Sequence, residues 1–237
     1  MAKITSYEGK IPKRIDDFVI YLLGDDLIIR QNSGFTSKGV MQEAKYVLCR
    51  QNASEFGLVS KTCKAIRVVV ADGLTRHNNL EVVNNFTKMM RSLLVYDAEH
   101  ERGSRTLKSA LATLEAQERL KGYVFTPDFK LQLQKVNHRL DVSIPDVFFA
   151  RRNVYLGFSV QYLYFDFDTL TGYLESTNWQ MELLDKTISF LLPDGLPDGY
   201  LFPLYRFSFF LKQEDGSFLP ILPDEKGLVV GQLAVGV

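Results

Sequence analysis

Apolar residues recur at helical spacing in the first half of the chain. Between residues 41 and 71 they return every three or four positions, which is the period of one helix face. The stripe is Met41, Ala44, Leu48, Asn52, Phe56, Val59, Cys63, Ile66 and Val70. It predicts one long helix of about 30 residues, ~45 Å long at about 1.5 Å per residue. Gly57 inside this helix permits a bend.

A β-hairpin is expected before the long helix, over residues 16–32. Two β-rich runs flank the turn residues Gly24-Asp25-Asp26. Two further helices are expected after it, from about Asn79 to Tyr96 and from a cap at Ser104 to about Leu120. Because two strands alone are only marginally stable, the hairpin must pack on another element. The three amphipathic helices predict a helical layer.

From Tyr123 onward the apolar positions alternate, which is the period of a half-buried strand. The strand-like runs are residues 129–136, 139–144, 156–167, 179–192, 200–211, 217–222 and 227–237. Seven or eight short strands with turn signals between them favour an antiparallel, sandwich-like β domain. The sequence therefore predicts an α+β protein, with a hairpin and helical domain at residues 1–122 and an antiparallel β domain at residues 123–237.

Charge is balanced over the whole chain but not along it. The 237 residues carry 28 Lys and Arg against 28 Asp and Glu, so no global field recruits nucleic acid or an anionic membrane. Residues 1–125 hold 19 basic against 14 acidic residues, and residues 126–237 hold 9 against 14. The two halves are thus able to attract each other, within or between copies, although ordinary scatter also explains the difference.

Cysteine usage and the N-terminus favour a reducing compartment. If Cys49 and Cys63 share one helix, about 21 Å of rise separates them, whereas a disulfide needs Cα atoms within about 7 Å. Both are expected to be small buried hydrophobic residues. The chain starts without an apolar signal core, and no apolar run approaches 18 residues. We therefore expect a cytoplasmic protein that does not span a membrane.

Motifs for catalysis, metals and cofactors are not found. The histidines, His77, His100 and His138, have no second ligand at metal spacing. The glycines fit neither GxGxxG nor GxxxxGK[ST], and GxSxG is absent. Asp166 and Asp168 share one strand face and would suit a cation or acid–base work, but acidic residues at a strand end also mark turns. We expect no enzyme, no metal and no cofactor.

Basic residues recur along the long helix and form the candidate interaction site. Arg50, Lys61, Lys64 and Arg67 form this row, and Arg102, Arg105 and Lys108 gather at the start of the third helix. Such residues are able to contact phosphates, but acidic residues are interspersed and no helix-turn-helix pattern is present. Asn52 lies on the apolar stripe, which predicts either a buried amide with partners or an exposed break in the helix.

The stretch Arg50-Gln51-Asn52-Ala53-Ser54-Glu55-Phe56-Gly57, continued by Lys61, Lys64 and Ile66-Arg67, resembles a pattern in a family of Bacteroidota proteins. Members carry an RxNASEFG helix after an N-terminal β-hairpin with Gly-Lys, and a β-rich C-terminal half. Here Gly9-Lys10, the 16–32 hairpin and the 50–67 helix follow in the same order. The resemblance implies a bacterial origin, with a phage or mobile element as a further source, and brings no activity or catalytic residue.

The function expected from the sequence is a non-enzymatic structural or adaptor subunit that acts through protein–protein assembly. The apolar strand at residues 227–237 is one segment suited to pair with another chain. A nucleic-acid-binding module remains an alternative through the basic row. A carbohydrate or small-ligand module is another, and it would use aromatic side chains of the β domain: Tyr162, Tyr164, Trp179 and Tyr205.

Overall fold

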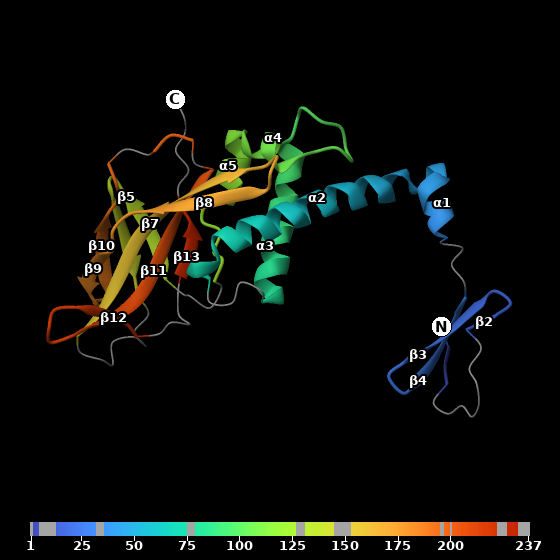
Figure 1. The fold of residues 1–237 in the computed structure, drawn as a ribbon, viewed down its shortest axis with the longest axis horizontal. Helices are drawn as coiled ribbons and strands as arrows, with labels where there is room; N and C mark the ends of the chain where they lie inside the picture. The colour runs from blue at the N-terminus through green and yellow to red at the C-terminus, as the bar shows by residue number, and fades with distance from the viewer. Residues whose placement is uncertain are drawn as a thin grey trace. The chain divides into compact units, whose positions relative to one another are not determined.

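The computed structural model describes residues 2–4, 13–31, 36–74, 79–126, 131–144, 153–194, 197–199, 201–221 and 227–231. The chain has the expected α+β fold, with helices and antiparallel sheets (Figure 1). Contacts divide it into two compact units, Met1–Asn52 and Ala53–Val237.

The N-terminal unit is built around a small antiparallel sheet in the order β1-β4-β3-β2. Its strands are β1 (Ala2–Ile4), β2 (Arg14–Ile15), β3 (Phe18–Leu23) and β4 (Asp26–Gln31). The expected hairpin is confirmed as β3 and β4, which pair from Phe18↔Gln31 to Leu23↔Asp26. Gly24 takes a positive φ of 62° in the turn, a conformation that glycine adopts without strain. The helices α1 (Ser37–Gln42) and η1 (Ala44–Tyr46, a 3-10 helix) come next in the chain.

The prediction of one helix from Met41 to Ala71 is wrong at its N-terminal end. Glu43 has extended backbone (φ −80°, ψ 138°) and separates α1 from η1. The long helix is α2 (Val47–Val69), and η2 (Ala71–Gly73) continues it. Arg50 closes the corner, because its Nη1 donates to the carbonyls of Val40 at 2.5 Å and Glu43 at 3.1 Å.

The second expected helix is confirmed, and the third is wrong in detail. Asn79 caps α3 (Leu80–Leu93) by accepting a hydrogen bond from the Glu81 N–H, and η3 (Leu94–Tyr96) extends it. The single helix expected from a cap at Ser104 is two short helices, α4 (Leu107–Leu111) and α5 (Leu114–Leu120). Each begins after its own threonine cap, Thr106 and Thr113.

Two antiparallel sheets form the β-rich half. A six-stranded sheet runs β12-β11-β7-β8, with β13 also paired to β11 and β9 to β7. A three-stranded sheet runs β10-β6-β5. The strands are β5 (Gln132–Val136), β6 (Arg139–Ser143), β7 (Val154–Asp166), β8 (Thr171–Ser176), β9 (Gln180–Leu183), β10 (Thr187–Leu191), β11 (Phe202–Lys212), β12 (Phe218–Pro220) and β13 (Gly227–Val230). Of these, β8 is the strand that the sequence pattern did not predict.

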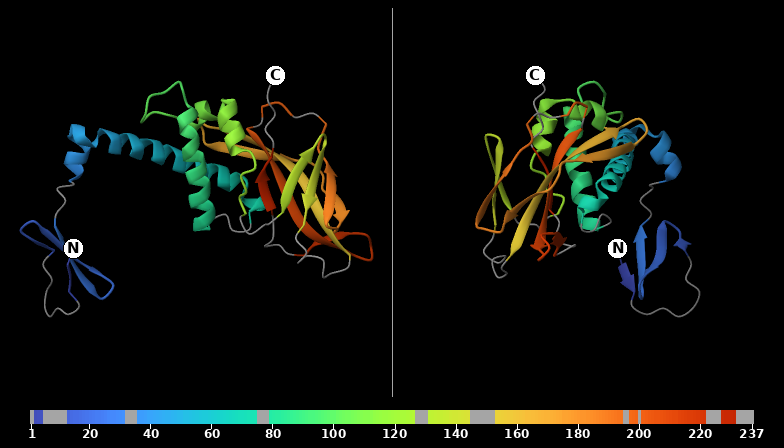
Figure 2. Two further views of the ribbon diagram at one scale, coloured as in Figure 1. Left: turned by 180° about the vertical axis from the view of Figure 1, so that it is seen from behind. Right: turned by 60° about the vertical axis from the view of Figure 1, so that its left-hand side comes forward.

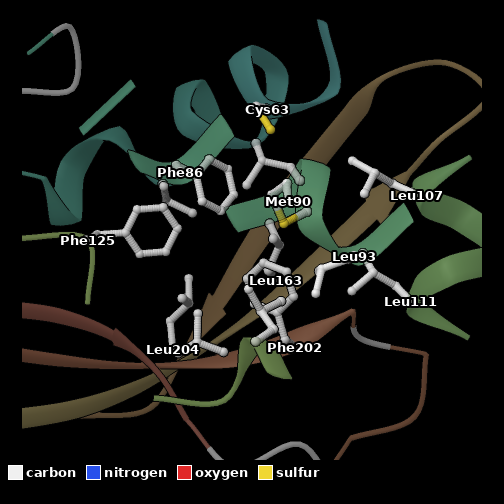
Figure 3. Close-up of a cluster of buried hydrophobic side chains, with 14 of the residues drawn as sticks. Cys63, Phe86, Met90, Leu93, Leu107, Leu111, Phe125, Leu163, Phe202 and Leu204 are labelled. Carbon is white, nitrogen blue, oxygen red and sulfur yellow. The ribbon is translucent and has the colours of Figure 1, made fainter. Parts of the chain in front are cut away.

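The six-stranded sheet carries a hydrophobic core on each face. Alternate residues of β7 and β11, such as Phe158 and Phe207, pack with Val142 and Phe190 of the three-stranded sheet, which makes the sandwich. Residues of the opposite face pack with the helices, and Figure 3 shows this second cluster. It contains Val59, Cys63, Ile66, Phe86, Met90, Leu93, Leu107, Leu111, Leu163, Phe202, Leu204 and Leu228.

The helices α3, α4 and α5 therefore lie against one side of the six-stranded sheet (Figure 2). The period of the sequence changes where the secondary structure changes, between the end of α5 at Leu120 and the start of β5 at Gln132. Helices and sheet share one core across this change. A division into separate domains at residue 122 stays a prediction.

Candidate interaction surfaces

The N-terminal sheet presents one apolar face that the described chain leaves partly uncovered. Strand register places Ile15, Phe18, Ile20, Leu22, Leu27 and Ile29 on this face, which we call the apolar sheet face. Ile20 and Leu27 are buried, whereas Ile15 is 50%, Phe18 46% and Leu22 59% exposed. In a sheet that buries one face, these three side chains would belong to the core.

A groove of about 490 Å³ lies between α2 and α3 in the C-terminal unit. We call it the helical groove, and its lining residues are Phe56, Ser60, Val83, Asn84, Thr87, Lys88, Arg91 and Ser92. Phe56 is 49% exposed, and the Arg91 guanidinium carbon lies 5.8 Å from the centroid of its ring. This is a cation–π contact at a site that stays open to solvent.

The helical groove has a positive charge that nothing in its lining offsets. Both ionisable groups that line it, Lys88 and Arg91, are cations, and within the described residues neither forms an ion pair. The carboxylate of Glu55, next to Phe56 in sequence, is buried and bound to Arg105 and to the Gly103 N–H instead. The groove thus combines an exposed ring with cations that have no carboxylate partner in its lining.

A second surface, at the end of the β7–β8 hairpin, has the opposite character. Register places Tyr164 opposite Tyr173 and Asp166 opposite Thr171, and the two tyrosine rings stack at 4.7 Å and 7°. The Tyr164 hydroxyl donates to Glu175 at 3.2 Å. Asp166, Thr171, Tyr173 and Glu175 are exposed. We call Tyr164, Asp166, Thr171, Tyr173 and Glu175 the acidic hairpin patch.

The basic row expected on the long helix does not form a continuous surface. Arg50 binds carbonyls of the preceding turn, and Arg67 is only 8% exposed. Lys61 and Lys64 are exposed. Asn52 is half-buried within α2, which runs from Val47 to Val69, so of the two alternatives for this residue the exposed helix break is wrong. Of these five residues only Lys61 and Lys64 are exposed, three positions apart on α2.

Arg67 of α2 is buried near Cys63 and Tyr123 and forms no ion pair with a described residue. Its Nη1 has no hydrogen-bond partner among the described residues, and burial lowers its pKa. Two weak acids lie near it: burial raises the pKa of Cys63 and of Tyr123 to about 12 each. Arg67 therefore adds positive charge to the same helix pair that forms the helical groove.

Two members of the second basic cluster, Arg105 and Lys108, bind carboxylates of other elements. Arg105 Nε and Nη2 bind Glu55 of α2 at 2.7 and 2.9 Å. Lys108 Nζ binds Asp168 after β7 at 2.8 Å. The other member of the expected carboxylate pair, Asp166, accepts from the Asp168 N–H and from Thr169, so it shapes the turn. The two carboxylates thus hold separate structural contacts.

Asp97, Glu99 and His100 are the residues of the described chain that come nearest to a metal site. One ligand atom of each lies within 4.8 Å of the others. However, the buried Asp97 carboxylate already accepts hydrogen bonds from the backbone N–H groups of Glu99, His100 and Thr106, and His100 Nδ1 lies 3.0 Å from it. Burial opposes the charge on Asp97, but these bonds hold its pKa below the usual range. The cluster orders the loop before α4.

The aromatic residues expected to bind a small ligand are divided between core and surface. Tyr162 and Tyr205 are buried in the sandwich core. Trp179 is half-buried, and the Arg206 guanidinium carbon lies 5.1 Å from its ring centroid. Tyr164 belongs to the acidic hairpin patch. The expected cleft lined by four exposed rings is therefore not formed by these residues.

The contacts of β13 oppose the expected pairing of the last strand with another chain. One edge of β13 pairs with β11, and the other accepts and donates hydrogen bonds with residues 122–126. Residues 232–237 lie outside the described part of the chain. The expected burial of both cysteines holds for Cys63 but is wrong for Cys49, which is exposed.

Sequence reasoning missed the helical groove and the acidic hairpin patch for identifiable reasons. The groove depends on how α2 and α3 meet, which no local pattern encodes. The patch depends on β8, a strand too polar to show an apolar run. One available signal is the spacing of Lys88 and Arg91, three residues apart on one helix face.

Comparison with models of known protein families, with curated proteins and with solved structures finds no match to this chain. The resemblance of residues 50–67 to a Bacteroidota family thus stays an expectation. Among the helices that the structure describes, none is both long enough and apolar enough to cross a lipid bilayer.

Proposed function

We propose that this protein is a non-enzymatic structural or adaptor subunit that acts through protein–protein assembly, in the first place with copies of itself. The observation that supports this most directly is the apolar sheet face. A unit of about 50 residues is near the lower limit of what folds alone. Among its described residues this unit buries the large apolar side chains Ile20, Leu27 and Ile28, and it exposes Ile15, Phe18 and Leu22.

The exposed residues share one face of two paired strands, on either side of the buried Ile20. Ile15 pairs with Phe18, and Leu22 lies on the same face of β3 four residues later. Isolated exposed apolar residues are normal on protein surfaces, but a continuous apolar face is typical of an interface. Covering it with a second chain would bury these side chains and stabilise the sheet at the same time.

The test is a pair of matched variants of the full chain. Replacing Phe18 and Leu22 by serine removes two exposed apolar side chains from the sheet face. Replacing Leu183 and Leu219, which are 55% and 54% exposed in the C-terminal unit, by serine makes the same chemical change elsewhere. Light scattering over a range of protein concentrations would measure the mass of each.

We expect the wild type and the Leu183/Leu219 variant to exceed the chain mass of 27.1 kDa as concentration rises. The Phe18/Leu22 variant should stay near that mass. A wild-type mass of one chain at every concentration would contradict self-assembly. Equal association by both variants would show that the apolar sheet face is not the contact.

The nucleic-acid alternative has less support, since of the row on the long helix only Lys61 and Lys64 are exposed side chains. It predicts binding that weakens steeply with salt and is lost when both lysines are replaced by glutamate. We also propose a cytoplasmic location, which rests on the sequence alone.

A further inference from the structure

The helical groove and the acidic hairpin patch are complementary in both charge and chemistry. The groove offers the cations Lys88 and Arg91 beside the exposed ring of Phe56. The patch offers the carboxylates of Asp166 and Glu175 beside a stacked tyrosine pair, of which Tyr173 is 57% exposed. Tyrosine and arginine are the residue types that most often anchor protein interfaces.

The charged residues in the sequence around the acidic hairpin patch are all acidic. From Val154 to Asp185 the chain contains five carboxylates and no lysine or arginine: Asp166, Asp168, Glu175, Glu182 and Asp185. Lys108 forms an ion pair with Asp168 and lies close enough to Asp166 to help lower the pKa of that carboxyl. Glu175 forms no ion pair with a described residue, so the negative charge of the patch exceeds what Lys108 offsets. The groove keeps its positive charge because no acidic residue lines it beside Lys88 and Arg91.

We propose that the helical groove of one copy binds the acidic hairpin patch of a second copy. The inference rests on the proposed function and names one contact of the assembly. Tyr173 lies over Phe56 and Arg91, and Glu175 faces Lys88 and Arg91. Because the two surfaces differ, the contact closes as a reciprocal dimer or continues from head to tail.

The experiment reverses the charge of each surface in the full chain. The groove variant is Lys88→Glu with Arg91→Glu, and the patch variant is Thr171→Lys with Glu175→Lys. Asp166 is left unchanged because it shapes the turn. Matched controls reverse exposed charges elsewhere, by Lys61→Glu with Lys64→Glu on α2 and by Glu115→Lys with Glu118→Lys on α5. Circular dichroism confirms that each variant is folded.

Sedimentation velocity at low salt measures self-association. We expect each surface variant alone to associate at least about tenfold more weakly than the wild type, since like charges then face each other across the contact. An equimolar mixture of the two should recover the wild-type affinity, because each groove again meets a patch of opposite charge. The controls should associate as the wild type does, alone and when mixed.

Three results would overturn the proposal: a wild type that does not self-associate, a groove variant that associates as tightly as the wild type, or a mixture of the groove and patch variants that associates no more tightly than either variant alone. The second and third results separate this proposal from the proposed function. If association survives the groove variant but is lost in the Phe18/Leu22 variant, the protein assembles through the apolar sheet face and the groove contact is wrong.

Discussion

Arg105 binds Glu55, fifty residues earlier in the chain, through two parallel hydrogen bonds of 2.7 and 2.9 Å. Glu55 is 2% exposed, and its Oε1 also accepts from the Gly103 N–H at 2.7 Å. The bond to Arg105 is the main reason that the pKa of Glu55 lies below its usual range. This carboxylate attaches the loop before α4 to α2.

Replacing Glu55 by alanine should destabilise the protein by roughly 3 kcal/mol, because the Arg105 guanidinium is then left without its partner in a partly buried site. Urea unfolding followed by circular dichroism measures the change. The exposed pair Lys108–Asp168 provides the control, and Lys108→Ala should unfold at the wild-type midpoint. Equal midpoints for both variants would contradict the role given to Glu55.

The stability of the protein should fall in mild acid. Glu55 and Asp97 have folded-state pKa values below their ordinary values of 4.5 and 3.8. Between the folded and the ordinary values the unfolded chain binds more protons, so stability rises with pH there. The contribution is complete above about pH 5 and is lost as pH falls through the folded values.

Urea midpoints measured between pH 6 and pH 3 test this dependence. The wild type should lose stability over that range, and Glu55→Gln should show a shallower loss because one of the two carboxyls no longer titrates. A Glu55→Gln profile parallel to that of the wild type would show that Glu55 does not carry the effect.

The sequence predicted the parts of the fold that depend on local patterns better than the parts that depend on contacts between distant residues. Periodicity predicted α3 and most strands, because helical and alternating patterns are local and each element buries one face. It failed at Glu43 and at Thr113, where the backbone is extended although the apolar spacing continues. Arg50 explains the first corner through contacts to carbonyls seven and ten residues away.

The candidate site was harder to predict for the same reason. Lys64 and Arg67 are both basic residues of α2, yet Arg67 is buried beside Cys63 and Lys64 is exposed. The partners of Arg105 and Lys108 lie fifty and sixty residues away. A row of basic residues therefore reveals which charges are present, but tertiary contacts decide which of them remain available to a partner.

Two glycine-to-alanine substitutions should change stability in opposite directions. At Gly157 a Cβ would overlap the Phe210 ring and lie 3.0 Å from Trp179, so Gly157→Ala should cost about 1–3 kcal/mol by overpacking. At Gly57, inside α2, nothing lies within 4 Å of the added atom, and Gly57→Ala should stabilise the helix by up to about 1 kcal/mol.

Thermal unfolding measures both substitutions. The fluorescence of Trp179, the one tryptophan of the chain, should change in Gly157→Ala and not in Gly57→Ala. Unchanged emission and stability in Gly157→Ala would contradict the packing of Phe210 and Trp179 over this position.

The two thiols should react at very different rates with a thiol reagent such as Ellman's reagent. Cys49 is exposed, whereas Cys63 is fully buried and burial raises its pKa to about 12, so its reactive thiolate is scarce at neutral pH. One thiol per chain should react quickly in the native protein and two after unfolding. Cys49→Ser should remove the fast reaction, and rapid reaction of both native thiols would contradict the burial of Cys63.

Hydrogen–deuterium exchange of the β3 and β4 amides tests the central claim most directly. With little apolar burial of its own, this sheet should exchange quickly when dilute and slowly once a second chain covers its apolar face. We predict that exchange over Phe18–Leu23 slows as protein concentration rises, while the amides of α3 keep one rate as an internal reference. The same exchange at every concentration would contradict the claim that the apolar sheet face is covered by another copy.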